Sequence, residues 1–303
     1  MILVVFLYMV CASMFTISKW ALAYTQPLFF VAVRMLAAGL LLNAYCLLKN
    51  PRLLEHKISY YIKRDWLLFA QVILFHIYLT YVCDACALKD ISSIESAFLY
   101  NLSPFIAALF SYMAFSEKMT PKKWLGLSLG FFSLIPSFIH EAYQGILLQS
   151  LTPKLITFGA VVFSAYGWVV VRKLVKERDY SSIFVNGVGM FFGGLLALVT
   201  SGCVECWDPF PVSHWIPFIQ ATILIVVVAN LIFYNLYGYL LKKYTATFLS
   251  FAGFMCPVFA ALLGWLFLGE RIPGSLLVSF LFVLSGLYIF YQEELRQGYI
   301  ESK

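Results

Sequence analysis

The segment PFIAAL at Pro104–Leu109 recurs as PVFAAL at Pro257–Leu262, 153 residues later. The same offset relates other identical residues in the surrounding sequence, namely Tyr81/Tyr234, Leu88/Leu241, Lys89/Lys242, Phe98/Phe251 and Glu117/Glu270. Nine of the 37 aligned pairs from position 81 to 117 are identical, where a composition this biased gives about three by chance. The chain therefore contains an internal repeat, with a weaker match between Arg34–Gly39 and Gly189–Gly194.

The composition places this repeat in a membrane. Hydrophobic residues make up 62% of the 303 residues and charged residues only 12%, and the mean hydropathy is +0.86. A soluble domain carries about 25% charged residues, so lipid must be the solvent for most of this surface. The net charge of +6 then indicates loops at an anionic membrane surface rather than a nucleic-acid-binding face.

Apolar runs long enough to cross a bilayer predict an all-α integral membrane protein with ten transmembrane helices. The first run begins at the N-terminus without a preceding basic residue, so we expect a retained helix rather than a signal peptide. The predicted spans are 2–22, 28–48, 66–88, 92–115, 123–140, 154–172, 182–201, 215–241, 245–268 and 274–292.

The basic residues predict the orientation of these spans. With both termini in the cytoplasm, the inner loops and tail hold sixteen lysines and arginines, and the outer loops hold only Lys89, Lys154 and Arg271. Cytoplasmic loops carry this excess of positive charge. We therefore expect a multi-pass protein of the cell inner membrane with both ends inside.

Each copy of the repeat contains five predicted helices. Because five is odd, the second copy enters the membrane from the opposite side, which predicts inverted-topology repeats of the kind many secondary transporters use. The predicted units are a first repeat at 1–145, a second at 151–292 and a cytoplasmic tail at 293–303.

The ends of the two fourth helices resemble the EamA-type branch of the drug/metabolite transporter superfamily. Each has a Pro-x(12)-Glu segment, Pro104 to Glu117 and Pro257 to Glu270, followed by a basic residue and a proline. The resemblance covers essentially the whole chain. It implies a central cavity lined by helices 1, 3, 4, 6, 8 and 9, transport without ATP hydrolysis and no cofactor. One departure is Ser116, where glycine is usual, which predicts a less tight turn.

Four ionisable residues lie within or beside predicted spans, and such residues are functional candidates because burying charge in a membrane is unfavourable. They are Lys19, Arg34, Asp84 and Glu95. Two cations and two acids at one depth suit a zwitterion. Alternatively, the four pair with one another, or Lys19 extends to the interface.

Aromatic and amide side chains on the implied lining helices complete the predicted substrate site. They are Tyr78, Tyr81, Asn101, Tyr166, Trp168, Asn230, Tyr234 and Tyr237. As a group these rings could stack on a planar ligand or hold a cation over a π face, although packing accounts better for each ring taken singly. Pro104 and Pro257 are predicted kinks, either hinges for gating or fixed bends.

The predicted function is secondary transport of a small amphipathic or zwitterionic metabolite by alternating access. The substrate is expected to be amino-acid-like, and the resemblance adds exchange of S-adenosylmethionine for S-adenosylhomocysteine as a specific candidate. Proton-coupled export of lipophilic cations is the alternative, and a membrane-embedded enzyme is the rival class, although its motifs are missing.

The chain contains seven cysteines, including the CxxC pairs Cys83/Cys86 and Cys203/Cys206. Their odd number and spacing do not indicate a disulfide framework. A metal site built from both pairs is the less favoured interpretation. The expected partners are the substrate and lipid, and the oligomeric state stays open, a monomer included.

Overall fold

The structure is a computed structural model that describes residues 2–49, 57–116, 119–132, 135, 151–269 and 276–298. These residues are almost entirely helical, and their one extended feature is an isolated bridge between Thr25 and Val212. The first half contains α1 Ile2–Leu22, α2 Pro27–Lys49, α3 Lys57–Gln71, α4 Thr80–Leu88, α5 Ser93–Leu99, α6 Ser103–Phe115 and α7 Pro121–Phe132. The second contains α9 Leu151–Arg172, α10 Ser182–Val204, α11 Trp215–Ile225, α12 Tyr234–Leu240, α13 Ala246–Ala252, α14 Cys256–Leu263 and α15 Leu276–Arg296.

Eight helical segments among the described residues are long and apolar enough to cross a membrane. Their bounds agree closely with eight of the predicted spans: Ile2–Leu22, Pro27–Lys49, Arg64–Leu88, Glu95–Phe115, Leu151–Glu177, Ser182–Val204, Trp215–Leu240 and Ala246–Leu268. The predicted span 123–140 lies partly outside the described residues. The last predicted span coincides with the 21-residue helix α15, which is not among the eight, so the count of ten is not confirmed.

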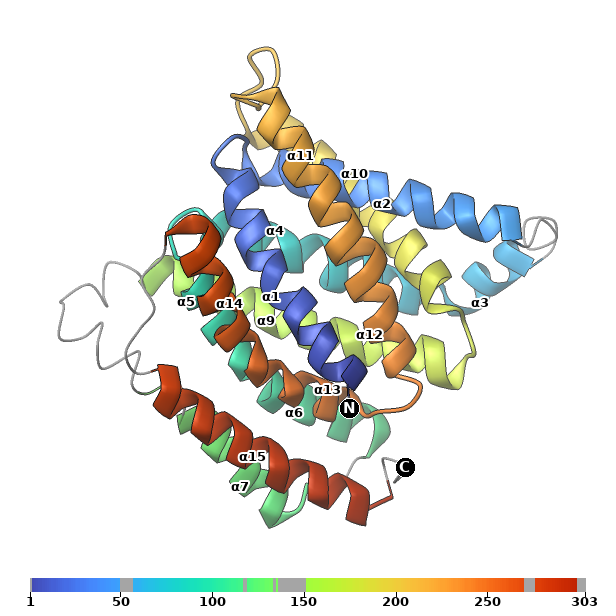
Figure 1. The fold of residues 1–303 in the computed structure, drawn as a ribbon. Helices are drawn as coiled ribbons and strands as arrows, with labels where there is room; N and C mark the ends of the chain where they lie inside the picture. Colours follow the sequence, from blue (N-terminus) through green and yellow to red (C-terminus); the bar gives the residue numbers. More distant parts are fainter. Residues whose placement is uncertain are drawn as a thin grey trace.

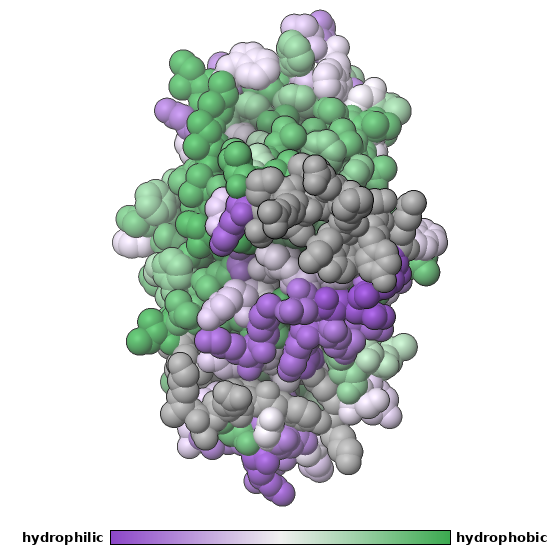
Figure 2. All heavy atoms as spheres, turned by 90° about the vertical axis from the view of Figure 1, so that its right-hand side faces the viewer, coloured by the Kyte–Doolittle hydropathy of each residue, from purple (hydrophilic) through white to green (hydrophobic). Residues whose placement is uncertain are grey.

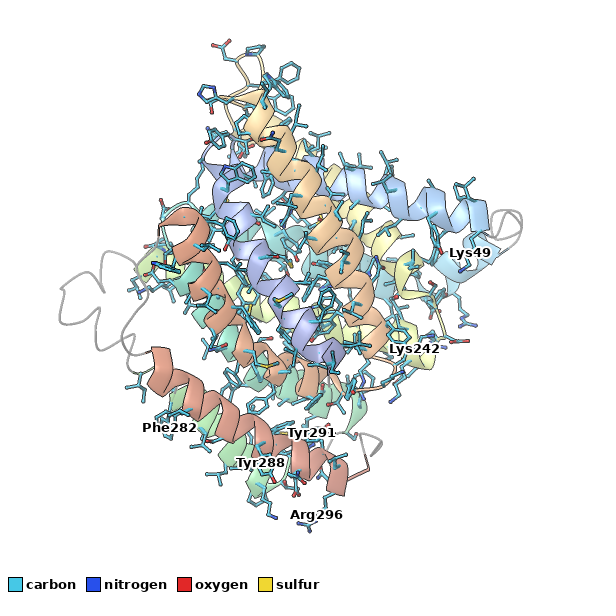
Figure 3. All side chains as sticks on the ribbon, in the orientation of Figure 1. Lys49, Lys242, Phe282, Tyr288, Tyr291 and Arg296 are labelled. Atoms are coloured by element: carbon cyan, nitrogen blue, oxygen red, sulfur yellow. The ribbon has the colours of Figure 1, made fainter. Side chains whose placement is uncertain are left out.

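The surface agrees with a lipid environment. Large apolar side chains such as Leu40, Val199 and Ile216 are exposed, and Figure 2 shows apolar surface over the upper part of one face with a hydrophilic patch across its lower half. Figure 3 places the basic residues Lys49, Lys242 and Arg296 at the ends of α2, α12 and α15. In Figure 1, α1 begins and α15 ends at the lower side of the molecule, opposite the loop before α11.

The sequence repeat is also a repeat of local structure. Helices α5 and α13 begin and end at positions that differ by 153, and each is followed by a 3₁₀ turn, Tyr100–Leu102 and Gly253–Met255, at the same offset. Two π-helical segments, Val72–Leu79 and Val226–Phe233, differ by 154. Helices of this irregular kind often mark functional sites.

The prolines lie where these irregular turns end. Pro104 and Pro257 occupy the first turn of α6 and of α14, directly after the 3₁₀ turns. The first residues of a helix donate no backbone hydrogen bond within it, so a proline is tolerated there. The irregularity of the helix is therefore the 3₁₀ turn, and the proline begins the next helix. The hinge role stays a prediction.

The turn at Ser116 is not loosened by the absence of glycine, contrary to the prediction. Ser116 has φ 51° and ends α6 in the left-handed conformation, as Gly269 does with φ 68° in the second repeat. A serine in this region is uncommon. The residues that follow, Glu117 and Lys118, and likewise Glu270 and Arg271, lie outside the described residues.

Helices α2 and α10 pack together through equivalent positions of the two repeats. A Cβ atom on Gly39 would lie 2.5 Å from the backbone nitrogen of Phe191, and one on Gly194 would lie 2.9 Å from that of Leu36. Leu36 and Gly39 correspond to Phe191 and Gly194 at an offset of 155. Because the lower-numbered residue of one helix meets the higher-numbered residue of the other, the two helices run antiparallel at this contact.

Helices α7 and α15 form a separate pair beside the main bundle (Figure 1). A buried ion pair between Lys123 and Glu294 joins them, and Thr245 donates a hydrogen bond of 2.8 Å to the same carboxylate. The pair therefore contacts the bundle at the start of α13, and Phe290 packs on Phe251 further along the same helix.

Candidate functional site

A cavity lies at the centre of the bundle. The space that a water-sized sphere can occupy in it is about 80 Å³, and its walls come from α1, α2, α4, α6, α9, α12, α13, α14 and the irregular segments between helices. Five of the predicted substrate-binding residues line it, namely Arg34, Tyr81, Asp84, Trp168 and Tyr237. Both repeats contribute, and the lining residues Tyr100 and Gly253 are the first residues of the two 3₁₀ turns.

Arg34 supplies the positive charge of the cavity. It is only 2% exposed, and its guanidinium lies 4.3 Å from the ring centre of Tyr81 and 5.1 Å from that of Phe30. Its one hydrogen bond in the described residues is a long one of 3.4 Å to the Ser18 hydroxyl, and its Nε has no partner there. No carboxylate among the described residues lies within ion-pair distance of it. In-plane N–H groups are therefore left for a bound anion.

Asp84, on α4, supplies the negative charge. It is buried, and its carboxylate accepts a hydrogen bond of 3.5 Å from Ser96 and interacts with the hydroxyl of Tyr100. Arg34 is near enough to act on it electrostatically without forming a direct ion pair. The two charges thus share one cavity without contacting each other, which is the arrangement that binds the two ends of a zwitterion.

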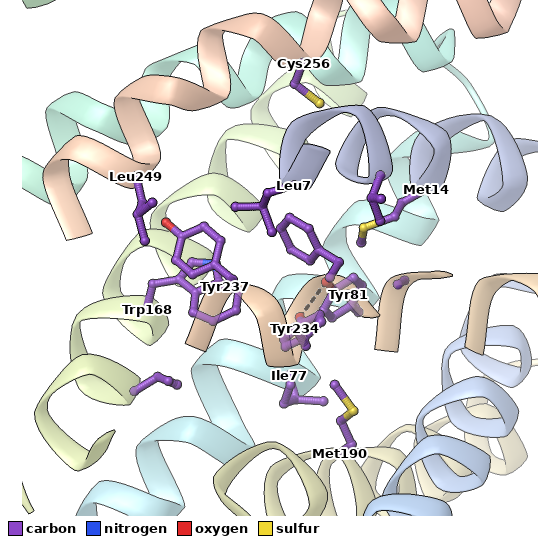
Figure 4. Packing of buried hydrophobic residues seen from close by; sticks show 14 of the residues in the cluster. Leu7, Met14, Ile77, Tyr81, Trp168, Met190, Tyr234, Tyr237, Leu249 and Cys256 are labelled. Carbon is purple, nitrogen blue, oxygen red and sulfur yellow. Dashed lines mark hydrogen bonds between the residues drawn. The ribbon is translucent and has the colours of Figure 1, made fainter. Parts of the chain in front are cut away.

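Aromatic rings form another wall. Trp168 stacks on Tyr237 with ring centres 3.9 Å apart and planes at 23°, and Tyr237 lies 3.4 Å from the Ser250 hydroxyl. Beside them Tyr234 donates a hydrogen bond to Tyr81, drawn as a dashed line in Figure 4. Tyr81 and Tyr234 occupy equivalent positions of the sequence repeat, so this bond joins the two halves of the chain.

Two predicted charged residues have their side chains elsewhere. The ammonium of Lys19 donates to the carbonyls of Leu88, Lys89 and Ile91 at 2.7, 3.1 and 2.7 Å. It therefore satisfies the carboxyl end of α4. The carboxylate of Glu95 accepts a bond of 2.7 Å from the backbone of Ser92, whose hydroxyl accepts one from Glu95 in return.

The role of Glu95 could have been found in the sequence. Ser92-Ser-Ile-Glu95 matches the capping-box pattern at a helix start, and Lys154 lies 3.9 Å from the same carboxylate. Glu95 thus interacts with Ser92 and Lys154 rather than with another of the four charged residues, while Arg34 and Asp84 remain at the cavity.

The remaining predicted residues lie around the cavity rather than on its wall. Tyr78 hydrogen-bonds Thr200 at 2.7 Å, Tyr166 packs edge-on against Phe75 and Phe110, and the Asn230 amide contacts the sulfur of Met35 at 3.1 Å. Asn101 is buried, and its amide has no hydrogen-bond partner in the described part of the chain. Tyr234 takes part through its bond to Tyr81.

Several lining residues were not predicted. Tyr8, Cys11, Met14, Phe15 and Ser18 form one face of α1, and their spacing of three and four residues is the signal that marks a helix face. In an apolar transmembrane helix this signal is weak, because lipid-facing and buried positions have the same composition. Tyr8 also donates a hydrogen bond to the carbonyl of Leu249, which ties α1 to α13.

A model of the EamA-like transporter family matches residues 1–138 and 152–292. The chain belongs to this family. It is therefore a multi-pass membrane transporter, in agreement with the apolar helices.

Relatives within the family are similar over nearly the full length. A protein of Chlamydia muridarum named S-adenosylmethionine/S-adenosylhomocysteine transporter is 36% identical over 298 residues, covering 96% of this chain and 91% of its own. A Chlamydia trachomatis protein of the same name is 36% identical, with 95% and 88% covered. An uncharacterized transporter of Bacillus subtilis is 27% identical. A solved crystal structure covers 96% of both chains with a TM-score of 0.73 at 15% identity, which shows the fold.

Proposed function

We propose that this protein exchanges S-adenosylmethionine for S-adenosylhomocysteine across the cell inner membrane by alternating access. The two Chlamydia relatives carry that name at 36% identity. The observation that carries the proposal for this chain is the pair of buried, mutually unpaired charges, Arg34 and Asp84, on one central cavity. Both proposed substrates end in an amino acid, whose carboxylate would bind the guanidinium and whose ammonium would bind the carboxylate.

The aromatic wall supports the nucleoside half of the substrate. Adenine is planar, and rings such as those of Trp168 and Tyr237 provide the apolar surface and polar tips that bind such a group. The alternative, export of lipophilic cations, would use Asp84 and the aromatic wall, but it leaves the buried guanidinium of Arg34 without a partner, because such cations have no carboxylate.

The architecture proposed for this cycle is two inverted five-helix repeats, at 1–145 and 151–292, with the tail at 293–303 inside the cell. The double match of the family model, the common offsets of the helix ends and the antiparallel contact of α2 with α10 support it. A fifth and a tenth span complete the proposed count of ten helices.

Orientation can be tested with two exposed positions that this proposal places on opposite sides, Ser213 and Lys176. In a background with Cys203 and Cys206 replaced by serine, an impermeant thiol reagent should label Ser213→Cys in intact cells. It should label Lys176→Cys only after permeabilisation. Labelling of Lys176→Cys from outside would contradict the proposed cytoplasmic location of the loop between α9 and α10.

The transport proposal is tested with purified protein in liposomes. Vesicles loaded with S-adenosylhomocysteine should accumulate labelled S-adenosylmethionine, and empty vesicles should not. Excess unlabelled S-adenosylhomocysteine outside should compete, whereas adenosine, which lacks the zwitterion, should compete weakly. Equal uptake into loaded and empty vesicles would refute exchange, and strong competition by a lipophilic cation would favour the alternative function.

A further inference from the structure

The fixed charges on the cavity cancel. Among the described residues that line it, Arg34 and Asp84 are the only ones charged at neutral pH, and the others are aromatic, hydroxyl-bearing, sulfur-containing or glycine. The other two predicted charged residues are engaged outside it: Lys19 with the end of α4 and Glu95 with the start of α5. The cavity thus matches one positive and one negative charge on a ligand, and no more.

The proposed substrates differ from each other by one charge. At neutral pH S-adenosylhomocysteine is a zwitterion with no net charge. S-Adenosylmethionine has the same carboxylate and ammonium, and its methylated sulfur is a sulfonium that adds one positive charge. Arg34 and Asp84 can match the amino-acid end that both molecules share, and no other acid among the described lining residues remains to neutralise the sulfonium. The aromatic wall can hold such a cation over its π faces without cancelling its charge.

The cavity without a ligand is energetically less favourable than the cavity with a ligand bound. Without a ligand, Arg34 and Asp84 stay buried with no direct ion pair between them, and uncompensated buried charges are strongly unfavourable. A zwitterion in the cavity supplies both missing partners. Each crossing of the membrane therefore favours a loaded cavity, which couples the inward movement of one substrate to the outward movement of the other.

We infer that the exchange is electrogenic: each cycle carries one net positive charge in the direction of S-adenosylmethionine, so that the membrane potential drives its uptake. This inference rests on the proposed function. An inside-negative potential set by a tenfold potassium gradient shifts the equilibrium of a one-charge exchange by about tenfold, because the free energy of moving a charge is proportional to the potential. The protein contributes no charge of its own to this movement.

The experiment uses the purified protein in liposomes with valinomycin and defined potassium gradients. With S-adenosylhomocysteine inside and labelled S-adenosylmethionine outside, a tenfold gradient that makes the interior negative should raise the plateau ratio of the exchange by about tenfold. The reverse gradient should lower it equally. The matched control has S-adenosylmethionine on both sides, where exchange moves no net charge and the plateau of label should not respond.

The outcomes separate the inference from the function on which it rests. If neither arrangement exchanges label, the proposed function fails. If both exchange label but the plateau with S-adenosylhomocysteine inside ignores the potential, the electrogenic inference is wrong. A plateau that follows an imposed pH gradient instead would show that a proton, carried on Asp84 or elsewhere, cancels the sulfonium charge.

Discussion

Replacement of Arg34 by alanine tests the binding site most directly. The guanidinium is 2% exposed, lies on the rings of Tyr81 and Phe30, and has one long hydrogen bond, to Ser18. Its removal therefore breaks no ion pair among the described residues, so the main loss falls on the ligand. Truncation of one partner of a buried, hydrogen-bonded charge pair costs about 2–5 kcal/mol. We expect the Kd for either substrate to rise by about 30- to 4,000-fold.

Binding should be measured on detergent-solubilised protein with labelled substrate, alongside thermal stability and gel filtration. Arg178→Ala is a matched control, because it removes an arginine that is 43% exposed in its side chain and paired with Asp65. This control should keep wild-type affinity. Arg34→Lys preserves the charge but loses the planar fork, so its affinity should fall by at least about tenfold. A folded Arg34→Ala protein with affinity within about threefold of wild type would refute the assignment of the carboxylate to Arg34.

Three further perturbations follow from the contacts. Gly194→Ala should lower the melting temperature, because its new Cβ would lie 2.9 Å from a backbone nitrogen of α2. Gly202→Ala on the same helix should leave the melting temperature unchanged, because its Cβ meets nothing within 4 Å. Equal melting temperatures of the two variants would contradict the close approach. Lys19→Met should destabilise the protein by about 1–3 kcal/mol, since it leaves three carbonyls without the ammonium that donates to them. The Kd for the substrate should change little. A large loss of affinity at unchanged stability would instead show that Lys19 binds the substrate. Pro104→Ala and Pro257→Ala should bias thiol accessibility of the cavity toward opposite sides of the membrane, and a shift in the same direction would make the prolines packing features.

The sequence predicts the helices better than the site, for a physical reason. Span ends follow from hydrophobic length, and the first predicted span coincides with Ile2–Leu22. The repeat offset also places Tyr81 and Tyr234 at equivalent positions, and the structure joins these two residues by a hydrogen bond.

The depth of a charged residue in the membrane, which the sequence predicts, does not determine what its side chain contacts. Lys19 and Arg34 are both cations in the outer half of predicted helices, yet one reaches three carbonyls and the other has a free Nε at the cavity. The direction of each side chain around its helix decides between these outcomes. The partners of Lys19 are backbone atoms some 70 residues away, which no residue pattern specifies.

The bond between Tyr81 and Tyr234 has a consequence for the energetics of the cycle. If the two repeats exchange conformations, a contact between equivalent residues is converted into the same contact. It is therefore present in both end states. Its free energy then cancels from the difference between inward-open and outward-open forms and enters only the intermediate between them. Substitution of either hydroxyl should therefore change how fast the transporter switches sides while leaving the populations of the two sides where they were.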